Sequence, residues 1–137
     1  MKILPRMVLA AALAYPASAF TETSKEAIPP PSVQEEFDGF IKKFRAALKA
    51  DDSAAVASMT RLPLGYDNSV RNAAQFRAAA YPRDFTANNR ACIEHSKAVY
   101  DRDGLNNDNY FIFCGEEIFT FTKTPAGFLF TEVGMND

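Results

Sequence analysis

The chain has 137 residues, with 15 Lys and Arg against 17 Asp and Glu and a formal net charge of −2 at pH 7. Mixed charges with a small acidic excess exclude the basic stripe typical of nucleic-acid-binding proteins and the polybasic patch that binds anionic membranes. The length provides a core for one domain, but not for two.

The first 19 residues have the pattern of a secretory signal peptide. Two basic residues are followed by an apolar run over 7–14 that is too short to span a bilayer, and residues 17–19 have the small side chains of a cleavage site. We expect cleavage between Ala19 and Phe20, and a periplasmic or secreted product that leaves the membrane. Removing 19 of 137 residues leaves 118, and losing the two cations changes the net charge from −2 to −4.

Cys92 and Cys114 are the two cysteines of the chain, and both remain after cleavage. In an exported protein an even pair predicts a disulfide bond, which would close a loop of about 22 residues and contribute about 3 kcal/mol. The alternatives are two buried thiols or a metal site that includes His95, but a zinc site needs a second closely spaced ligand pair. We expect neither a metal nor another cofactor.

A proline-rich segment over residues 20–32 precedes a single predicted domain over 33–137. We expect its three consecutive prolines, 29–31, to stay extended and outside any helix. Ser32 and Glu35 have capping-box spacing, so a helix is predicted from Val33 to about Ala50. Its apolar residues recur every three or four positions and form one stripe: Phe37, Phe40, Ile41, Phe44 and Leu48.

Three shorter helices are predicted next. Residues 51–53 cap a helix over 54–59, and Thr86 caps one over 87–95. Between them we expect a helix over 72–80 that buries Phe76 and is stopped by Pro82.

The pattern then changes to strands, with a short strand over 97–100, a turn-rich tip over 101–108 and a long hairpin over 109–136. Helices followed by an antiparallel meander predict an α+β fold. Because alternate residues of a strand share a face, unbroken alternation through Gly115 would place four phenylalanines on one side of the sheet: Phe111, Phe113, Phe119 and Phe121.

With these elements in place, the chain resembles the nuclear transport factor 2-like superfamily. The matching features are the long first helix with its aromatic stripe, the break at residues 51–52, the segments around 62–64 and Phe76, and the closing strand from Gly127. The Cys-Gly-Glu at 114–116 and the Phe-Thr-Glu-Val-Gly at 130–134 resemble small exported members whose role is mostly undescribed. The resemblance implies a cystatin-like cone, in which a curved antiparallel sheet wraps the long helix and leaves a cavity at one end. Such folds serve enzymes, adaptors and immunity proteins alike.

The candidate pocket residues are Tyr66, His95 and Glu117. Glu116 and Glu117 point to opposite faces of a strand, and we expect Glu117 to face the interior because it has the parity of the phenylalanines. His95 lies near the end of a helix and would need a carboxylate such as Glu117 to act as a general base. The alternating oxygen ligands over 101–108 resemble part of a calcium loop, but lack its final glutamate and also suit an ordinary hairpin tip.

These features predict an exported binding module without catalysis, whose partner is a protein or a small apolar ligand, with a homodimer as a further option. One alternative is a cone-cavity enzyme of the isomerase, dehydratase or hydrolase kind that uses Glu117 and His95. Another is an immunity-type inhibitor that blocks a toxin.

Overall fold

The computed structural model describes residues 27–136. The predicted signal peptide and the cleavage site between Ala19 and Phe20 lie outside this range. Among the described residues, no helix is both long and apolar enough to cross a membrane.

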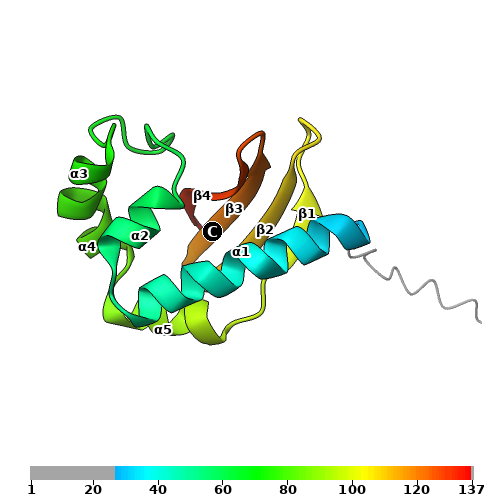
Figure 1. Ribbon diagram of the computed structural model, residues 1–137, viewed down its shortest axis with the longest axis horizontal. Helices are drawn as coiled ribbons and strands as arrows, with labels where there is room; N and C mark the ends of the chain where they lie inside the picture. The colour runs from blue at the N-terminus through cyan, green and yellow to red at the C-terminus, as the bar shows by residue number, and fades with distance from the viewer. Residues whose placement is uncertain (1–26, 137) are drawn as a thin grey trace, which may run out of the picture.

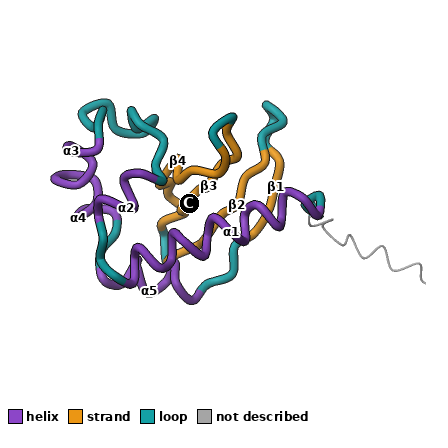
Figure 2. The backbone as a smooth tube through the Cα atoms, in the orientation of Figure 1, coloured by secondary structure: helices purple, strands orange, loops and turns teal. Residues whose placement is uncertain are grey.

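The fold is α+β, as predicted, with the helices first and the strands after them (Figure 1). Helix α1 crosses one face of the sheet, and the shorter helices gather at one end of α1 (Figure 2). The helical elements are α1 Pro31–Lys49, α2 Ser53–Ser58, α3 Ala73–Gln75, the π-helix η1 Phe76–Ala80, α4 Tyr81–Asp84 and α5 Ala87–His95. The strands are β1 Val99–Arg102, β2 Asp108–Cys114, β3 Glu117–Thr124 and β4 Gly127–Met135.

The four strands form one antiparallel sheet in the order β1-β2-β3-β4. The register between β3 and β4 shifts between Thr120 and Phe121, which leaves Thr131 as an extra residue of β4. On its outer edge, β4 is joined by the chain after α2, because Thr60 forms a parallel bridge with Phe130. The two edges of the sheet are therefore β1 and β4, and the β4 edge is covered at Phe130.

Helix α1 begins two residues earlier than predicted. Pro31 is its first residue, and Pro30 precedes it without a side-chain cap, so the expected capping box does not form and Pro31 is not outside the helix. Proline suits this position because the first amides of a helix have no carbonyl partner to lose.

The apolar stripe of α1 packs against the face of the sheet that we call the inner face. The ring of Phe37 stacks on that of Tyr110 with centroids 3.7 Å apart, and Phe44 meets Phe121 edge to face at 5.0 Å. Edge-to-face aromatic pairs add stability beyond the area that they bury. This layer is the core of the domain.

The predicted placement of the four strand phenylalanines on one face is wrong. Phe119 and Phe121 lie on the inner face, but Phe111 and Phe113 lie on the opposite, outer face. In β2 the inner-face positions are taken by Tyr110 and Ile112. A two-residue turn pairs Cys114 with Glu117, so even-numbered positions of β2 share a face with odd-numbered positions of β3. The prediction carried one parity through the turn, whereas the reversal of the chain changes it.

The short helices follow their capping residues. Asp52 accepts a hydrogen bond from the amide of Ala55 and Thr86 from that of Asn89, and α5 has the predicted bounds. Pro82 does not stop the middle helix. The chain continues through η1 into α4, with the Tyr81 amide donating to the carbonyl of Phe76. Proline normally clashes with the carbonyl four residues earlier, and the wider π turn gives it room.

The two faces of the sheet predict different costs for the same substitution. We expect Phe121→Ala to lower the free energy of unfolding by about 3–5 kcal/mol, because Phe121 is fully buried. We expect Phe113→Ala to cost about 1 kcal/mol or less, since its side chain is half exposed. Urea denaturation measures both. Equal losses would contradict the register described here.

Candidate binding surface

Aromatic side chains fill the space between α1 and the inner face of the sheet, where the resemblance implies a cavity. Five phenylalanines of this layer are fully buried and contact one another: Phe44, Phe85, Phe119, Phe121 and Phe130. The hollows available for binding are therefore surface depressions around this core.

The outer face of the sheet presents apolar side chains to solvent. Val99 is 42% exposed and Phe113 48%, and Phe111 and Ile118 beside them are half-buried. Together with Gly134 they line a groove of about 510 Å³. We call this the outer groove. Contiguous apolar surface of this kind makes the outer groove a candidate interaction site.

The charges in the outer groove are all negative. Asp101 and Glu132 line it, and no Lys or Arg is among its described lining residues. Next to it, Asn109, Thr122 and Thr131 form a buried hydrogen-bonded row across three strands, with oxygen–oxygen distances of 2.6 and 2.8 Å. These polar groups satisfy one another, so the row is structural.

Tyr66 and Glu117 line a second depression, of about 350 Å³, at the end of the sheet near α4. Its other lining residues are Asp67, Arg83, Asp84, Val133 and Met135. We call this the acidic depression. Three carboxylates and one guanidinium give it a formal charge of −2.

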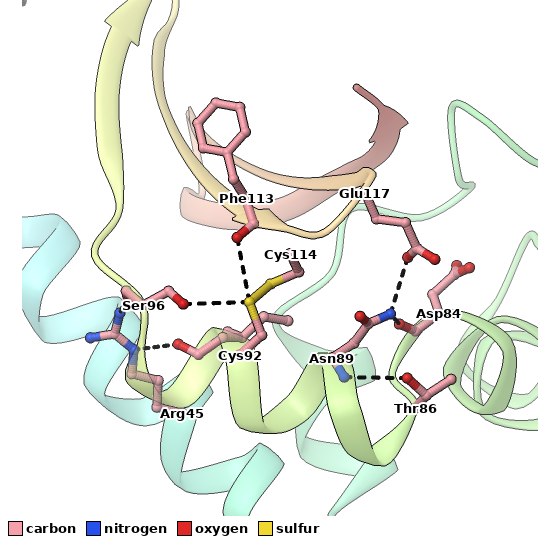
Figure 3. The surroundings of a disulfide bond; sticks show 10 residues. Arg45, Asp84, Thr86, Asn89, Cys92, Ser96, Phe113, Cys114 and Glu117 are labelled. Carbon is pink, nitrogen blue, oxygen red and sulfur yellow. Dashed lines mark hydrogen bonds between the residues drawn. A yellow bond between two sulfur atoms is a disulfide. The ribbon is translucent and has the colours of Figure 1, made fainter. Parts of the chain in front are cut away.

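Glu117 lies on the inner side of the sheet, and Glu116 lies exposed in the turn before it. The Glu117 carboxylate accepts a hydrogen bond of 3.1 Å from the Asn89 side chain, which also donates to the carbonyl of Asp84 (Figure 3). Asn89 thereby connects α5, α4 and β3. Among the described residues, the Glu117 carboxylate has no cation within ion-pair distance.

Arg83 organises the rest of the acidic depression. It donates to both oxygens of Asp84 at 2.9 Å and to Asp67 at 2.6 Å. These hydrogen bonds, first to Asp84 and then to Asp67, raise the pKa of Arg83. In return, the bond from Arg83 and those from Ser69 lower the pKa of Asp67 to about 2. Both Arg83 and Asp67 are therefore charged at neutral pH.

The Tyr66 hydroxyl donates to Asp84 at 2.9 Å. Burial, followed by the neighbouring Asp84 carboxylate, raises the pKa of Tyr66 above its usual range. The phenol is therefore a neutral hydrogen-bond donor that is already occupied. It fixes the orientation of Asp84.

His95 is not part of this group. It is exposed at the end of α5 and lines a different depression, of about 490 Å³, between α1 and the chain that leads into β1. Asp38 and Arg45 lie in the same depression, and Arg45 donates to the carbonyls of Ile93 and Ser96. The structure thus brings Tyr66 and Glu117 into one hollow and places His95 in another.

Cys92 and Cys114 form the predicted disulfide, with a Cα–Cα distance of 5.9 Å. It joins α5 to the end of β2, and the Phe113 ring points away from it on the other side of the sheet (Figure 3). The Ser96 hydroxyl donates to the Cys92 sulfur at 3.4 Å, because a disulfide sulfur has no hydrogen to give. The bond anchors the turn that carries Glu117.

The loop between β1 and β2 is organised by Asp103. Its carboxylate accepts hydrogen bonds from the amides of Leu105 and Asn107 and from the side chain of Asn109. These bonds, the backbone one from Asn107 first, lower the pKa of Asp103 to about 2. Within residues 27–136 no three His, Cys, Asp or Glu side chains are grouped as metal ligands. Asp103 therefore acts as the cap of a tight loop.

Comparisons with protein-family models, with curated proteins and with solved structures give no match.

Sequence reasoning did not find the outer groove or the residues Asp67, Arg83 and Asp84. The outer groove was missed because Phe111 and Phe113 were expected on the inner face. A two-residue turn at Gly115-Glu116 would have predicted them on the outer face. Arg83 and Asp84 follow Pro82, where the helix was expected to have ended, and their contact with Asp67 joins segments that no local pattern connects.

The disulfide gives a testable stability difference. We expect the double variant Cys92→Ser/Cys114→Ser to lose about 3 kcal/mol of unfolding free energy, since the bond closes a loop with a sequence separation of 22. Intact mass of the untreated protein should lie two protons below the reduced value. Wild-type protein unfolded under reducing conditions is the control, and it should match the double variant. A reduced mass in freshly purified exported protein would contradict the pairing.

Proposed function

We propose that the mature protein is a small exported binding module that holds a protein partner on the outer face of its sheet. The observation that carries this proposal is the outer groove, where exposed aromatic and aliphatic side chains are flanked by the carboxylates of Asp101 and Glu132. The proposal gives this surface a partner with apolar side chains next to basic ones.

The character of the groove supports a protein partner. Phe111 and Phe113 stand side by side on β2 as rigid aromatic anchors, and large aromatic side chains carry much of the energy of protein interfaces. Asp101 and Glu132 at the rim would select basic partners and speed their approach. A second copy of this chain offers the same two carboxylates and is therefore the less favoured occupant.

The separation of His95 from Glu117 supports binding over the enzyme alternative. Proton transfer needs an acid and a base within hydrogen-bond reach of one reacting atom, or linked by one water. Here the two side chains line different depressions, and the Tyr66 hydroxyl is held by Asp84. No observation favours the toxin-inhibitor alternative over other protein partners.

We further propose that the domain is a small member of the nuclear transport factor 2-like superfamily, with a cystatin-like cone in which the curved sheet wraps a long N-terminal helix. Support comes from the 19-residue helix α1 packed on one face of an antiparallel meander. In this proposal the cone is closed by phenylalanines, so its binding function has moved to the outside of the sheet.

Export follows from the signal-peptide pattern and leads to a direct prediction. The mature protein should begin at Phe20, as read by N-terminal sequencing of the exported product. Ala19→Phe should block cleavage, because the peptidase requires a small side chain there, and should leave a precursor that is 19 residues longer. Ser18→Ala keeps a small residue and should be processed normally. A mature protein that still contains residues 1–19 would contradict this prediction.

The binding surface can be tested by photo-crosslinking in the cells that make the protein. A benzoylphenylalanine at position 113 should give a discrete adduct with a partner protein, because this side chain stands at the centre of the proposed interface. The same group at Lys43, an exposed residue of α1 that lines none of the depressions, is the matched control and should give none.

Three other outcomes of this experiment would overturn the proposal. Adducts of equal strength at positions 113 and 43 would indicate random collision. An adduct between two copies of this chain would identify the face as a homodimer interface. No adduct at Phe111, Phe113 or Ile118, from a protein that is correctly folded, would show that the face has no protein partner.

A further inference from the structure

The later part of β4 is an unpaired edge of the sheet. The edge is covered at Phe130, because the Phe130 amide donates to the carbonyl of Met59 and the Arg61 amide donates to the carbonyl of Phe130. After Arg61 the covering chain leaves the sheet. Beyond that point β4 has β3 on one side and, among the described residues, no strand on the other.

The register shows which backbone groups face outward at this edge. The Asn136 amide donates to the carbonyl of Glu116, so position 136 faces β3. Positions alternate along a strand, and Met135 and Val133 therefore direct their amide and carbonyl groups away from β3. No backbone or side-chain hydrogen bond to these groups exists within residues 27–136. Two donors and two acceptors are thus available to an added strand.

This edge runs between the two depressions already described. Val133 and Met135 line the acidic depression on the inner side, and Glu132 and Gly134 line the outer groove on the other side. Gly134 has no side chain, and the space where one would lie is open. A strand placed along this edge would direct alternate side chains into the two hollows.

We propose that the edge of β4 at Val133–Met135 binds an extended segment of the partner protein as an added strand, with basic side chains over the acidic depression and apolar ones over the outer groove. This inference rests on the proposed function and specifies its partner. Backbone hydrogen bonds would supply the affinity, and the two hollows would supply the sequence preference, as in other cases of strand addition.

Charge complementarity determines the basic side of the segment. Within residues 27–136, Glu117 accepts a hydrogen bond from the Asn89 side chain and has no cation partner, and the depression around it has an excess of two negative charges. An Arg or Lys reaching in beside Met135 would pair with that carboxylate through a charge-assisted hydrogen bond. An acidic segment would be repelled there and again at Glu132.

The other sheet edge is less suited to strand addition. The first strand, β1, has only four residues. Ala27 and Pro29 lie beside it, because they line one depression together with Val99 and Tyr100. At the β4 edge the fold already adds one short parallel segment at Thr60. A partner strand would continue the sheet from the place where this segment ends.

The test uses a synthetic peptide, acetyl-Arg-Val-Lys-Phe-Arg-Val-amide, and the mature protein. Peptide binding should protect the amides of Val133 and Met135 from hydrogen exchange, because these amides have no hydrogen-bond acceptor within residues 27–136 of the free protein. The peptide amides form two alternating sets, and only one set faces β4. N-methylation of that set should abolish binding, whereas N-methylation of the other set should leave binding unchanged. Protection at β1 instead, or equal binding of both methylated sets, would overturn the proposal.

Three protein variants separate the contribution of the backbone from that of the charge. Met135→Pro removes one outward-facing amide hydrogen, and proline is tolerated at a sheet edge. Peptide binding should weaken by about tenfold or more, because one backbone hydrogen bond is lost and the proline ring obstructs the added strand. Met135→Ala keeps the amide and is the control. Glu117→Gln should lower the affinity for the basic peptide by about threefold to tenfold. It should not change the affinity for a peptide with norleucine in place of Arg and Lys. Equal effects of the two Met135 variants would contradict strand addition.

The result separates this inference from the proposed function. If position 113 crosslinks to a partner but the peptide gives no protection at Val133 and Met135, the partner uses the outer face without adding a strand, and only this inference fails. If the peptide binds at the edge but position 113 gives no adduct, the outer face is not the partner surface and the proposed function fails.

Discussion

The packing of α1 against the inner face of the sheet is the interaction on which the rest of the structure depends. A four-stranded meander with one aromatic face is not stable in water by itself, and a single amphipathic helix is not stable either. Each provides the apolar surface that the other needs. Phe44 lies at the centre of this layer, against Phe121, Phe130 and Phe85. Because these rings come from α1, β3, β4 and the chain before α5, one cluster fixes the positions of all of these elements.

The same packing explains why the hollows of the described domain lie on its periphery. Within residues 27–136, large aromatic rings fill the layer between α1 and the inner face of the sheet. The remaining hollows lie where the sheet ends or where its outer face is uncovered. The disulfide holds the β2–β3 turn against α5, and Asn89 continues this connection to Glu117 and α4. The acidic depression is therefore built on rigid elements, although its residues come from segments far apart in the sequence. Its proximity to the free edge of β4 gives that edge a chemical preference.

The outer face combines two features that proteins usually avoid together, exposed aromatic side chains and an unpaired strand. Within the described residues, the segment Met59–Arg61 covers β4 at Phe130, and no backbone hydrogen bond covers the outward-facing groups of Val133 and Met135. Glu132 and Asp101 supply negative charges that oppose self-association through this face. A surface that disfavours a second copy of itself and still exposes aromatic anchors is suited to a different, basic partner.

The sequence by itself determined the order of the elements, the α+β class, the stripe of α1, the start and end of α5 and the disulfide pairing. These depend on local causes, such as a cap at Thr86, a period of three to four residues, or two cysteines that follow a signal-peptide pattern. It did not determine which phenylalanines face α1, because the two-residue turn between Cys114 and Glu117 reverses the parity that local alternation suggests. Nor did it determine the start of α1 at Pro31 or the passage of the helix through Pro82, since both depend on how backbone amides are used. Only the tertiary structure placed Tyr66 with Glu117 and apart from His95. That arrangement results from packing among α4, α5 and β3, and no spacing in the chain encodes it.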